Sequence, residues 1–328
     1  MTVVVIGSNS FSGSDFIDLL LGETDHRVVG ISRSPEKGPL FLPYLHNAER
    51  QRFQFVALDL NRDIESICEL IGALQPQYVV NFASQSEVAP SWDHPEQWAQ
   101  TNVVSTAALG NFLSRCAWLV RYLHISTPEV YGSCAGAVRE DHRFDPSTPY
   151  AASRAGAELM LRTLIRGRGL RCVVVRSANV YGAHQQLHKI VPRTAIHLKL
   201  QRPLELHGGG WARRSFIHVR DVSRGELAIL QRGEVGTAYH LATEDTVTIR
   251  DLVRRICELA GAEFDAHVVV AEDRPGQDNA YLLDCTRAHA LGWRAEVPLD
   301  AGLAEVLSWV EQEWSQIEHQ PLEYRHRP

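Results

Sequence analysis

Short apolar runs alternate with stretches of helical periodicity along most of the chain. The runs are rich in Val, Ile and Leu, and each is followed by a turn and then by apolar residues three or four positions apart. Continuous β-branched runs are typical of parallel strands that are buried on both faces. We therefore predict strands at residues 2–6, 27–31, 53–57, 78–83, 119–125 and 171–176. Their alternation with helices predicts an α/β fold with a doubly wound parallel sheet of the Rossmann type.

The character of the sequence changes beyond Gly182, where histidines, prolines and a triple glycine interrupt the alternation. We expect residues 1–178 and 214–248 to form a dinucleotide-binding domain. Residues 179–213 and 249–328 are expected to form a smaller α+β domain that binds the substrate. Strands at 215–219 and 237–241 are predicted to return to the edge of the sheet. The longer helices are predicted at residues 95–115, 150–166, 247–260 and 299–317.

Composition narrows the class of protein. The chain has 328 residues, of which 45% are hydrophobic and 22% charged, and its formal net charge is −6. This charge provides no basic surface for a nucleic acid or an anionic membrane. The six cysteines are scattered without a Cys-x-x-Cys pair, which favours free thiols in the reducing cytoplasm. His184 and His188 stand four residues apart without a third ligand, so no metal site is expected.

The first predicted strand ends in a glycine-bounded turn, Gly7-Ser-Asn-Ser-Phe-Ser-Gly13, which leads directly into a helix. A strand, such a turn and a helix N-terminus together direct backbone N–H groups at a pyrophosphate. A plain tight turn is the alternative. The residues expected to touch a dinucleotide here are Gly7, Asn9, Ser10, Phe11, Ser12 and Gly13.

Two further strand ends carry polar residues that suit a dinucleotide. Ser32 and Arg33 follow the second strand, where an arginine can accommodate the 2′-phosphate of NADP. This gives a slight preference for NADP over NAD. Asp59, followed by Leu60, stands after the third strand and can accept from an adenine amino group; the alternative is that it caps the next helix. The small residues after the fourth strand suit close backbone approach to a cofactor.

Tyr150 and Arg154 lie one turn apart at the start of a predicted helix, so they share one face of it. A fixed positive charge near a phenol lowers its pKa from about 10 and makes the phenolate accessible. Such a tyrosine can remove a proton from a sugar hydroxyl while a hydride leaves for a nicotinamide. The alternative is a helix start that carries these two residues by chance.

The order of these motifs resembles that of the extended short-chain dehydrogenases/reductases, and within them the nucleotide-sugar epimerases and dehydratases. The resemblance runs through nearly the whole chain. Its most specific segments are similar to the 4,6-dehydratases that act on dTDP-glucose and GDP-mannose: Ser126-Thr-Pro-Glu-Val-Tyr-Gly132 and Arg274-Pro-Gly-Gln-Asp278.

The resemblance implies a reaction and a set of residues for it. Tyr150, with Thr127 on the same hydroxyl, would deprotonate C4 during its oxidation, and Glu129 would abstract the proton at C5. Water would leave from C6, and the hydride would return there from a tightly bound NAD(P). Ser126 and Arg154 complete the implied catalytic group.

The resemblance also implies binding residues and a partner. A homodimer through a four-helix bundle is implied, built from the helices at 95–115 and 150–166. The remaining cofactor-binding residues implied are Phe82, Ala83, Ser84 and Asn102. The implied substrate-binding residues are Gln85, Ser86, Asn179, Lys189, Arg214 and Arg274.

The sequence departs from the family pattern at two positions. Pro128 stands where related dehydratases carry an acid or hydroxyl that protonates the leaving group, and Arg154 stands where they carry lysine. Three functions therefore stay open. They are a 4,6-dehydratase, a 4-epimerase or decarboxylase that uses the same 4-keto intermediate, and a non-catalytic NAD(P)-binding protein.

Overall fold

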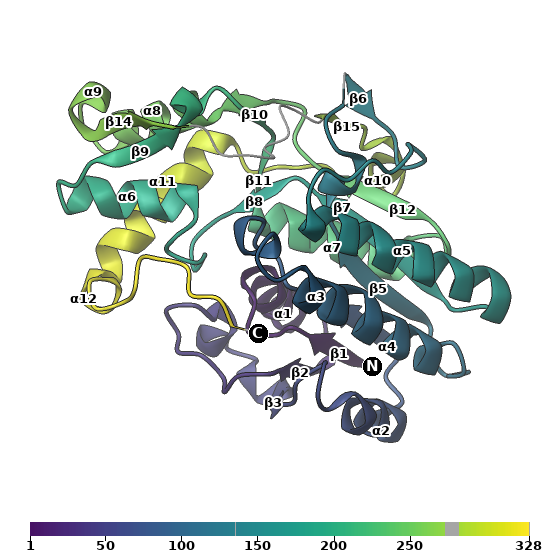
Figure 1. Ribbon diagram of the computed structural model, residues 1–328. Helices are drawn as coiled ribbons and strands as arrows, with labels where there is room; N and C mark the ends of the chain where they lie inside the picture. The colour runs from purple at the N-terminus through teal and green to yellow at the C-terminus, as the bar shows by residue number, and fades with distance from the viewer. Residues whose placement is uncertain (135, 273–281, 328) are drawn as a thin grey trace.

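The computed structural model describes residues 1–134, 136–272 and 282–327, and it contains one large sheet and several smaller ones (Figure 1). The large sheet has seven parallel strands in the order β12-β7-β5-β4-β1-β2-β3. Its strands are β1 (Thr2–Ile6), β2 (Arg27–Ser32), β3 (Phe53–Ala57), β4 (Tyr78–Asn81), β5 (Arg121–Ser126), β7 (Cys172–Ser177) and β12 (Ala238–Leu241). This order confirms the predicted doubly wound sheet, and it reverses direction between β1 and β4, where such folds bind their ligands.

Helices cover both faces of this sheet. Other helices lie outside the large sheet. The helices of both kinds in the described residues are α1 (Phe11–Glu23), α2 (Ile64–Leu74), α3 (Pro95–Trp98), α4 (Thr106–Leu113), α5 (Pro149–Arg168), α6 (Ile190–Lys199), α7 (Val219–Arg232), α8 (Ile249–Leu259), α9 (Phe264–His267), α10 (Thr286–Ala290), α11 (Leu299–Gln312) and α12 (Trp314–Ile317). A π-helical segment, η4 (Ala99–Ser105), joins α3 to α4, so the predicted helix at 95–115 is nearly continuous. No helix in the described ranges is long and apolar enough to cross a membrane.

The alternation of side chains along β1 explains how both faces are buried. Val3 and Val5 pack with residues of α1 and α7, such as Phe16. Val4 and Ile6 pack on the opposite face with residues of α2 and α4, such as Leu109. Since successive side chains of a strand point to opposite faces, a fully apolar run is required where helices lie on both sides.

A second core lies between α6, α8 and α11 and includes Val191, Leu252 and Trp309. Four two-stranded sheets accompany it or flank the large sheet, and they pair β8 (Asn179–Tyr181) with β11 (Phe216–His218), β9 (Leu204–His207) with β14 (Val268–Ala271), β10 (Arg213–Arg214) with β13 (Val247–Thr248), and β6 (Ala137–Val138) with β15 (Leu282–Leu283).

Two expectations about the second half need revision. The strand predicted at 215–219 does not reach the edge of the large sheet, because β11 pairs with β8, whereas β12 occupies that edge. Cys285, Ala288 and Trp293 pack in the core on the α1 and α7 face of the sheet. This stretch, which we placed in the smaller domain, therefore returns to the large sheet.

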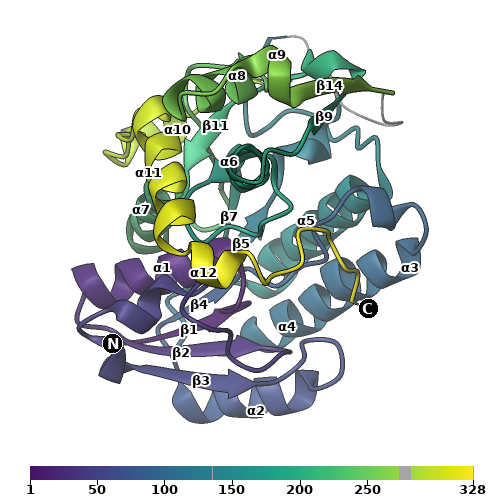
Figure 2. The ribbon, with the colours of Figure 1, turned by 90° about the vertical axis from the view of Figure 1, so that its left-hand side faces the viewer.

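The segment after α12 crosses back over the molecule towards α3, as the yellow trace in Figure 2 shows. It begins at Glu318, and its far end lies beside Trp98 of α3, where His326 stacks on the indole with ring centroids 5.1 Å apart. The chain after the second core is thus brought to the carboxyl edge of the large sheet.

Candidate active site

The turn between β1 and α1 requires glycine at both ends. Gly7 has a φ of +88°, and a Cβ there would lie 2.6 Å from the backbone nitrogen of Ala83. A Cβ on Gly13 would lie 2.5 Å from the carbonyl oxygen of Gly7. The hydroxyl of Ser10 caps α1, because it accepts from the N–H of Gly13 at 3.1 Å and donates to the Gly7 carbonyl at 2.6 Å. The turn thus presents a helix N-terminus at the reversal point of the sheet.

Asn9 and Ser32 join this turn to the loop after β2. The Asn9 N–H donates to the Ser32 hydroxyl at 2.9 Å, and the Asn9 amide nitrogen donates to the carbonyl of Pro35 at 2.9 Å. Lys37 donates to the Asn9 carbonyl at 2.8 Å. Our sequence reasoning missed Lys37, since a lysine in a polar loop carries no distinguishing pattern. It adds a positive charge at the rim of the turn.

The loop after β4 is held from behind by Asn102. Its side chain accepts from the N–H of Gln85 at 2.9 Å and donates to the Gln85 carbonyl at 3.0 Å and the Ser153 hydroxyl at 2.9 Å. Asn102 is fully buried. Asn102, which we expected to contact the cofactor, therefore holds in place the loop that contains Phe82, Ala83 and Ser84.

Asp59 forms a turn ahead of α2 rather than capping the helix directly. Its carboxylate accepts from the N–H of Asn61 at 2.8 Å. Leu60 is buried with the apolar residues between the sheet and α2. One carboxylate oxygen of Asp59 is thus engaged in the turn before α2, so Asp59 is not the helix cap that the alternative expected, and its contact with an adenine stays a prediction.

The reacting group predicted from the sequence comes together where β5 ends and α5 begins. Thr148 caps α5 by accepting from the N–H of Ala151 at 3.1 Å, which places Tyr150 in its first turn. Thr127, the residue after β5, shares a side-chain hydrogen bond with Tyr150. Thr127 also accepts from the N–H of Glu129 at 3.3 Å and so opens the short helix η5 (Pro128–Tyr131). The three side chains that the sequence assigned to proton transfer are therefore neighbours.

The electrostatics of Tyr150 differ from our expectation. Burial raises its pKa to about 12, and the Glu129 carboxylate raises it as well. The positive charge of Arg154 and the hydrogen bond from Thr127 act in the opposite direction. The predicted influence of Arg154 is thus present but does not dominate, because desolvation disfavours a buried phenolate more strongly.

Arg154 is 3% exposed, and its Nε and Nη1 atoms are buried without a hydrogen-bond partner in the described part of the chain. Buried guanidinium donors without partners are costly. Both nitrogens are enclosed by protein, and the charge of Arg154 also acts on the buried side chains of Tyr122 and His124.

Ser126, for which the resemblance implies a catalytic role, forms a hydrogen bond to a carboxylate on α5. Its hydroxyl donates to Oε1 of Glu158 at 2.6 Å, and Arg176 donates to the same oxygen at 2.9 Å. Glu158 lies one turn beyond Arg154 on α5, and Arg176 lies on β7. Sequence reasoning missed this buried pair; the usable signal was an arginine inside an otherwise apolar strand.

On the substrate side, Lys189 is already paired. Its ammonium lies 2.6 Å from Glu87, and His188 lies 3.3 Å from the same oxygen. Burial raises the pKa of Glu87, but hydrogen bonds and charge from His188 and Lys189 outweigh it and hold the value at about 2. Lys189 thus enters the site as part of an ion pair.

The remaining predicted substrate residues are dispersed over several elements. Asn179 begins β8, Arg214 ends β10, and Gln85 and Ser86 follow β4. Gln85 is buried whereas Ser86 is exposed. Arg274 lies outside the described residues.

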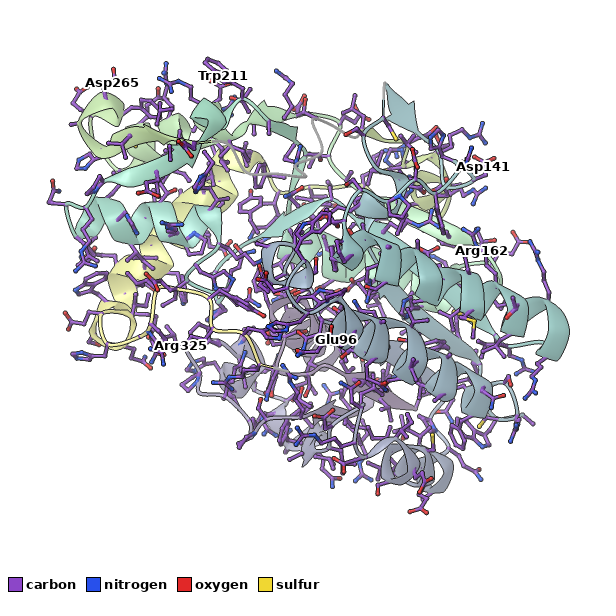
Figure 3. All side chains as sticks on the ribbon, viewed as in Figure 1. Glu96, Asp141, Arg162, Trp211, Asp265 and Arg325 are labelled. Atoms are coloured by element: carbon purple, nitrogen blue, oxygen red, sulfur yellow. The ribbon has the colours of Figure 1, made fainter. Side chains whose placement is uncertain are left out.

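The segment after α12 reaches the predicted cofactor residues. The carbonyl oxygen of Arg327 accepts from Arg33 at 3.0 Å and from Gln85 at 2.9 Å. His326 lies 2.6 Å from Oε1 of Gln97 and stacks on His94 as well as on Trp98. Figure 3 labels Arg325 on this segment and Glu96 on the helix it approaches. The Arg327 carbonyl oxygen therefore links residues that follow β2 and β4, the two strands on either side of β1 and its glycine turn.

The parallel sheet, the glycine turn after β1 and the Tyr150–Arg154 pair on α5 define an extended short-chain dehydrogenase/reductase. The family model described as GDP-mannose 4,6 dehydratase matches residues 4–306. The chain belongs to this family.

Individual relatives agree with the family assignment. A dTDP-glucose 4,6-dehydratase of Haemophilus influenzae is 30% identical, and the match covers 94% of this chain and 97% of that protein. A low-salt glycan biosynthesis protein of Haloferax volcanii is 31% identical over 92% of this chain and 96% of its own length.

Solved structures extend the similarity to the fold. The dTDP-glucose 4,6-dehydratase of Streptomyces venezuelae, determined with NAD bound, has a TM-score of 0.89 and is 29% identical, covering 96% of this chain and 98% of its own. A UDP-glucose 4-epimerase of Thermotoga maritima has a TM-score of 0.86 at 24% identity, covering 96% of this chain and 100% of its own. The epimerase shares the fold.

Proposed function

We propose that this protein is a nucleotide-sugar 4,6-dehydratase that uses a nicotinamide dinucleotide. The observation that carries the proposal is the cluster of Thr127, Glu129 and Tyr150 at the carboxyl end of β5. The effects of the Thr127 hydroxyl and the Glu129 carboxylate on the pKa of Tyr150 support the proposal, because they show that the three side chains are neighbours. The reaction needs one base for an alcohol and another for a carbon acid, and the cluster contains both.

The residues present fit a dinucleotide. The Gly7–Gly13 turn suits a pyrophosphate, and we propose that the guanidinium of Arg154, one turn beyond Tyr150, contacts the ribose hydroxyls. When bound, the cofactor would take a hydride from C4 and return one to C6. Arg33 and the neighbouring Lys37 favour the 2′-phosphate of NADP, although the related dehydratase of Streptomyces venezuelae was determined with NAD.

Oxidation at C4 needs the proton of the hydroxyl to leave. Tyr150 accepts this proton as phenolate, and Thr127 orients the same hydroxyl. Arg154 stabilises the phenolate, which opposes the effects of burial and of Glu129. The ketone formed at C4 makes the proton on C5 acidic.

Elimination is then assigned to Glu129. Its carboxylate takes the C5 proton, the electron pair forms the C5–C6 double bond, and the C6–O bond breaks. Pro128 has no side-chain donor, so the protonated Glu129 returns its proton to the departing hydroxyl and water leaves. One carboxyl group thereby serves as base and then as acid. When a hydride returns to C6, the electron pair of the double bond moves to C5, and a proton from solvent completes C5.

The nucleotide part is assigned to the side of the site opposite the glycine turn. Asn179 and Arg214 stand on short strands between the two cores, and we propose that they contact the diphosphate. Arg214 donates to the Arg213 carbonyl at 2.8 Å, and the geometry of a guanidinium matches phosphate oxygens. Lys189 is held in an ion pair with Glu87, which makes it a weaker phosphate ligand than its charge alone suggests.

A 4-epimerase or decarboxylase is the second candidate. The observation that favours it is Pro128, because those reactions use C4 oxidation without protonating a group that leaves from C6. The two candidates differ in the product and in isotope incorporation. A 4-keto-6-deoxy product with solvent deuterium at C5 indicates elimination, and an epimerised alcohol without deuterium excludes it. Decarboxylation also places solvent deuterium at C5, but it releases CO2 and gives a product that lacks C6.

We further propose a homodimer in which η4 and α5 pair with the same elements of a second copy. Apolar side chains are exposed on them, with Val104 53%, Leu159 52% and Met160 44% accessible. Exposed apolar side chains gathered on two adjacent helices suit a helix-bundle interface.

We also propose that the protein acts in the cytoplasm, because its six free thiols are compatible with a reducing compartment.

The decisive experiment is mass spectrometry of small molecules that co-purify with the protein, followed by assays on dTDP-glucose, UDP-glucose and GDP-mannose. A bound dinucleotide and a 4-keto-6-deoxy product from one sugar nucleotide are expected. Tight dinucleotide binding without turnover of any of them would favour the non-catalytic alternative.

A further inference from the structure

Three buried residues follow one another at four-residue spacing along α5. Tyr150, Arg154 and Glu158 are 9%, 3% and 1% exposed, and they lie on the face that meets the ends of β5 and β7. Oppositely charged residues four positions apart on a helix normally attract each other into an ion pair. Within the described ranges, however, Arg154 has no ion pair, and two of its guanidinium nitrogens have no partner.

Glu158 is occupied by other groups. Arg176 donates to both of its carboxylate oxygens, and Ser126 donates to one of them at 2.6 Å. Arg162, which is labelled on α5 in Figure 3, approaches the other oxygen at 3.6 Å. A carboxylate that already accepts this many charged and hydroxyl donors has little left to offer a further cation.

Arg176 cannot leave Glu158 without breaking several other contacts. It is fully buried on β7, and its Nη1 atom donates to the Tyr131 hydroxyl and to the Glu140 carbonyl, the latter at 3.0 Å. Its guanidinium lies 5.0 Å from the centre of the Tyr131 ring. Ser126 and Tyr131 bracket the turn that carries Thr127 and Glu129, so the pair also fixes both ends of that turn.

We propose that Arg176 is a positioning residue that, by saturating Glu158, keeps Arg154 directed at the dinucleotide and at Tyr150. Arg176 is needed for this positioning because residue 154 is an arginine. A guanidinium is a rigid fork with the reach and geometry for a bidentate bond to a carboxylate one turn away. In a buried setting a bare Glu158 would attract it strongly.

The inference rests on the proposed dinucleotide site, and it predicts a specific rescue. Arg176→Met leaves Glu158 with only the Ser126 hydroxyl and the more distant, solvent-exposed Arg162, so Arg154 turns to it and away from the cofactor. We expect dinucleotide affinity to fall roughly tenfold or more. In Arg176→Met/Glu158→Gln no carboxylate remains to attract Arg154, and affinity returns to within about threefold of the wild type.

Two readouts separate positioning from a structural role. The first is the dinucleotide Kd measured by NADH and NADPH fluorescence. The second is the ultraviolet titration of Tyr150, taken as the difference from Tyr150→Phe in each background. The phenol should titrate at higher pH in Arg176→Met than in the double variant.

If Arg176→Met does not fold, Arg176→Lys replaces it, since lysine keeps the charge but cannot bind both oxygens as a fork. Its affinity should fall by roughly threefold or more and recover when Glu158→Gln is added. A melting temperature measured on every variant gives the stability separately from the binding.

Restored affinity in the double variant supports the inference even where its melting temperature stays low. Affinity that follows the melting temperature through all variants, without a rescue, overturns it. A wild-type protein that binds neither dinucleotide contradicts the proposed function instead, so the two failures are distinguishable.

Discussion

Thr127 and Tyr150 share a hydrogen bond between the residue that follows β5 and the first turn of α5. The bond joins two elements that are 23 positions apart in sequence. It also lowers the pKa of a phenol that burial raises to about 12. The proton acceptor of the proposed reaction thus depends on a neighbour that belongs to another element.

Removing this hydrogen bond should slow the first chemical step. For Thr127→Val we expect C4 oxidation near neutral pH to fall by roughly tenfold, with a smaller loss at alkaline pH where more phenolate forms. Tyr150→Phe, which lacks the base, should lose roughly 10²- to 10⁴-fold at every pH. Single-turnover formation of reduced nicotinamide measures this step. An unchanged pH profile in Thr127→Val would show that the bond does not tune the phenol.

Glu129 should be needed for elimination but not for oxidation. Glu129→Gln removes the base for C5 while leaving Tyr150 and Thr127 in place. It should also ease ionisation of the phenol, because the Glu129 carboxylate raises the pKa of Tyr150. We expect reduced nicotinamide to form while dehydration falls by roughly 10²-fold or more. Product analysis by mass spectrometry in heavy water checks this, and full dehydration by the variant would remove Glu129 from the mechanism.

The segment that contains Arg327 should compete with the cofactor. Its carbonyl uses donors of Arg33 and Gln85, and His326 anchors it on Trp98. For His326→Ala we expect faster association and roughly three- to tenfold tighter binding of NADPH. In a larger fraction of the protein the segment then no longer covers the loops after β2 and β4. His319→Ala, an exposed site earlier in the same segment, is the control. Weaker binding by His326→Ala in stopped-flow measurements would instead indicate that the segment closes over the bound cofactor.

The exposed apolar face of η4 and α5 should control the oligomeric state. Leu159→Glu combined with Met160→Lys places charges within the proposed helix bundle and should convert a dimer to a monomer. Val235→Glu alters an apolar residue of similar exposure (42%) that lies outside η4 and α5 and should leave the dimer intact. Sedimentation measurements report the mass. A wild-type protein that is monomeric at all concentrations contradicts the proposal.

Glu226 should make the fold less stable as pH rises. Burial raises the pKa of its carboxyl well above the usual range, nearby Asp15 raises it further, and both carboxylate oxygens lack partners in the described chain. The folded state therefore holds a proton that the unfolded state releases above its ordinary pKa, so the stability present at acidic pH is lost on going to neutral pH. Glu226→Gln should be more stable than the wild type at pH 8 by about 1–3 kcal/mol and similar near pH 4. Urea unfolding at both values measures this, and an equal difference at the two pH values would show that ionisation is not the cause.

The local pattern predicted the elements of the first half well. The strand at 53–57 is β3 as predicted, and the helix from Tyr150 extends from Pro149 to Arg168. These elements are specified locally, by β-branched runs and by a Thr148 cap followed by Pro149. The strand at 215–219 formed with similar bounds but paired with β8, because the choice of a neighbouring strand depends on contacts remote in sequence.

The residues of the candidate site could be proposed from the sequence, but their contacts could not. Tyr150, Thr127 and Glu129 lie close together, and their catalytic roles stay a prediction. Ser126 donates to Glu158, and Asn102 holds a loop. Both types of role use the same polar residues in the same kind of segment. Only the position of a partner distinguishes a residue that faces a ligand from one that supports the site.

The sequence by itself determined the parallel sheet, the glycine turn and the reacting side chains, because each depends on spacing within a few residues. Tertiary structure alone decided that Arg176 pairs with Glu158, while Arg154 has no ion pair among the residues that the structure describes. It also decided that Arg327 contacts Arg33 from nearly 300 residues away. The pKa of Tyr150 is also decided by the tertiary structure, since it depends on how much water the whole fold excludes. Contacts and desolvation are properties of the packed chain, and no local pattern records them.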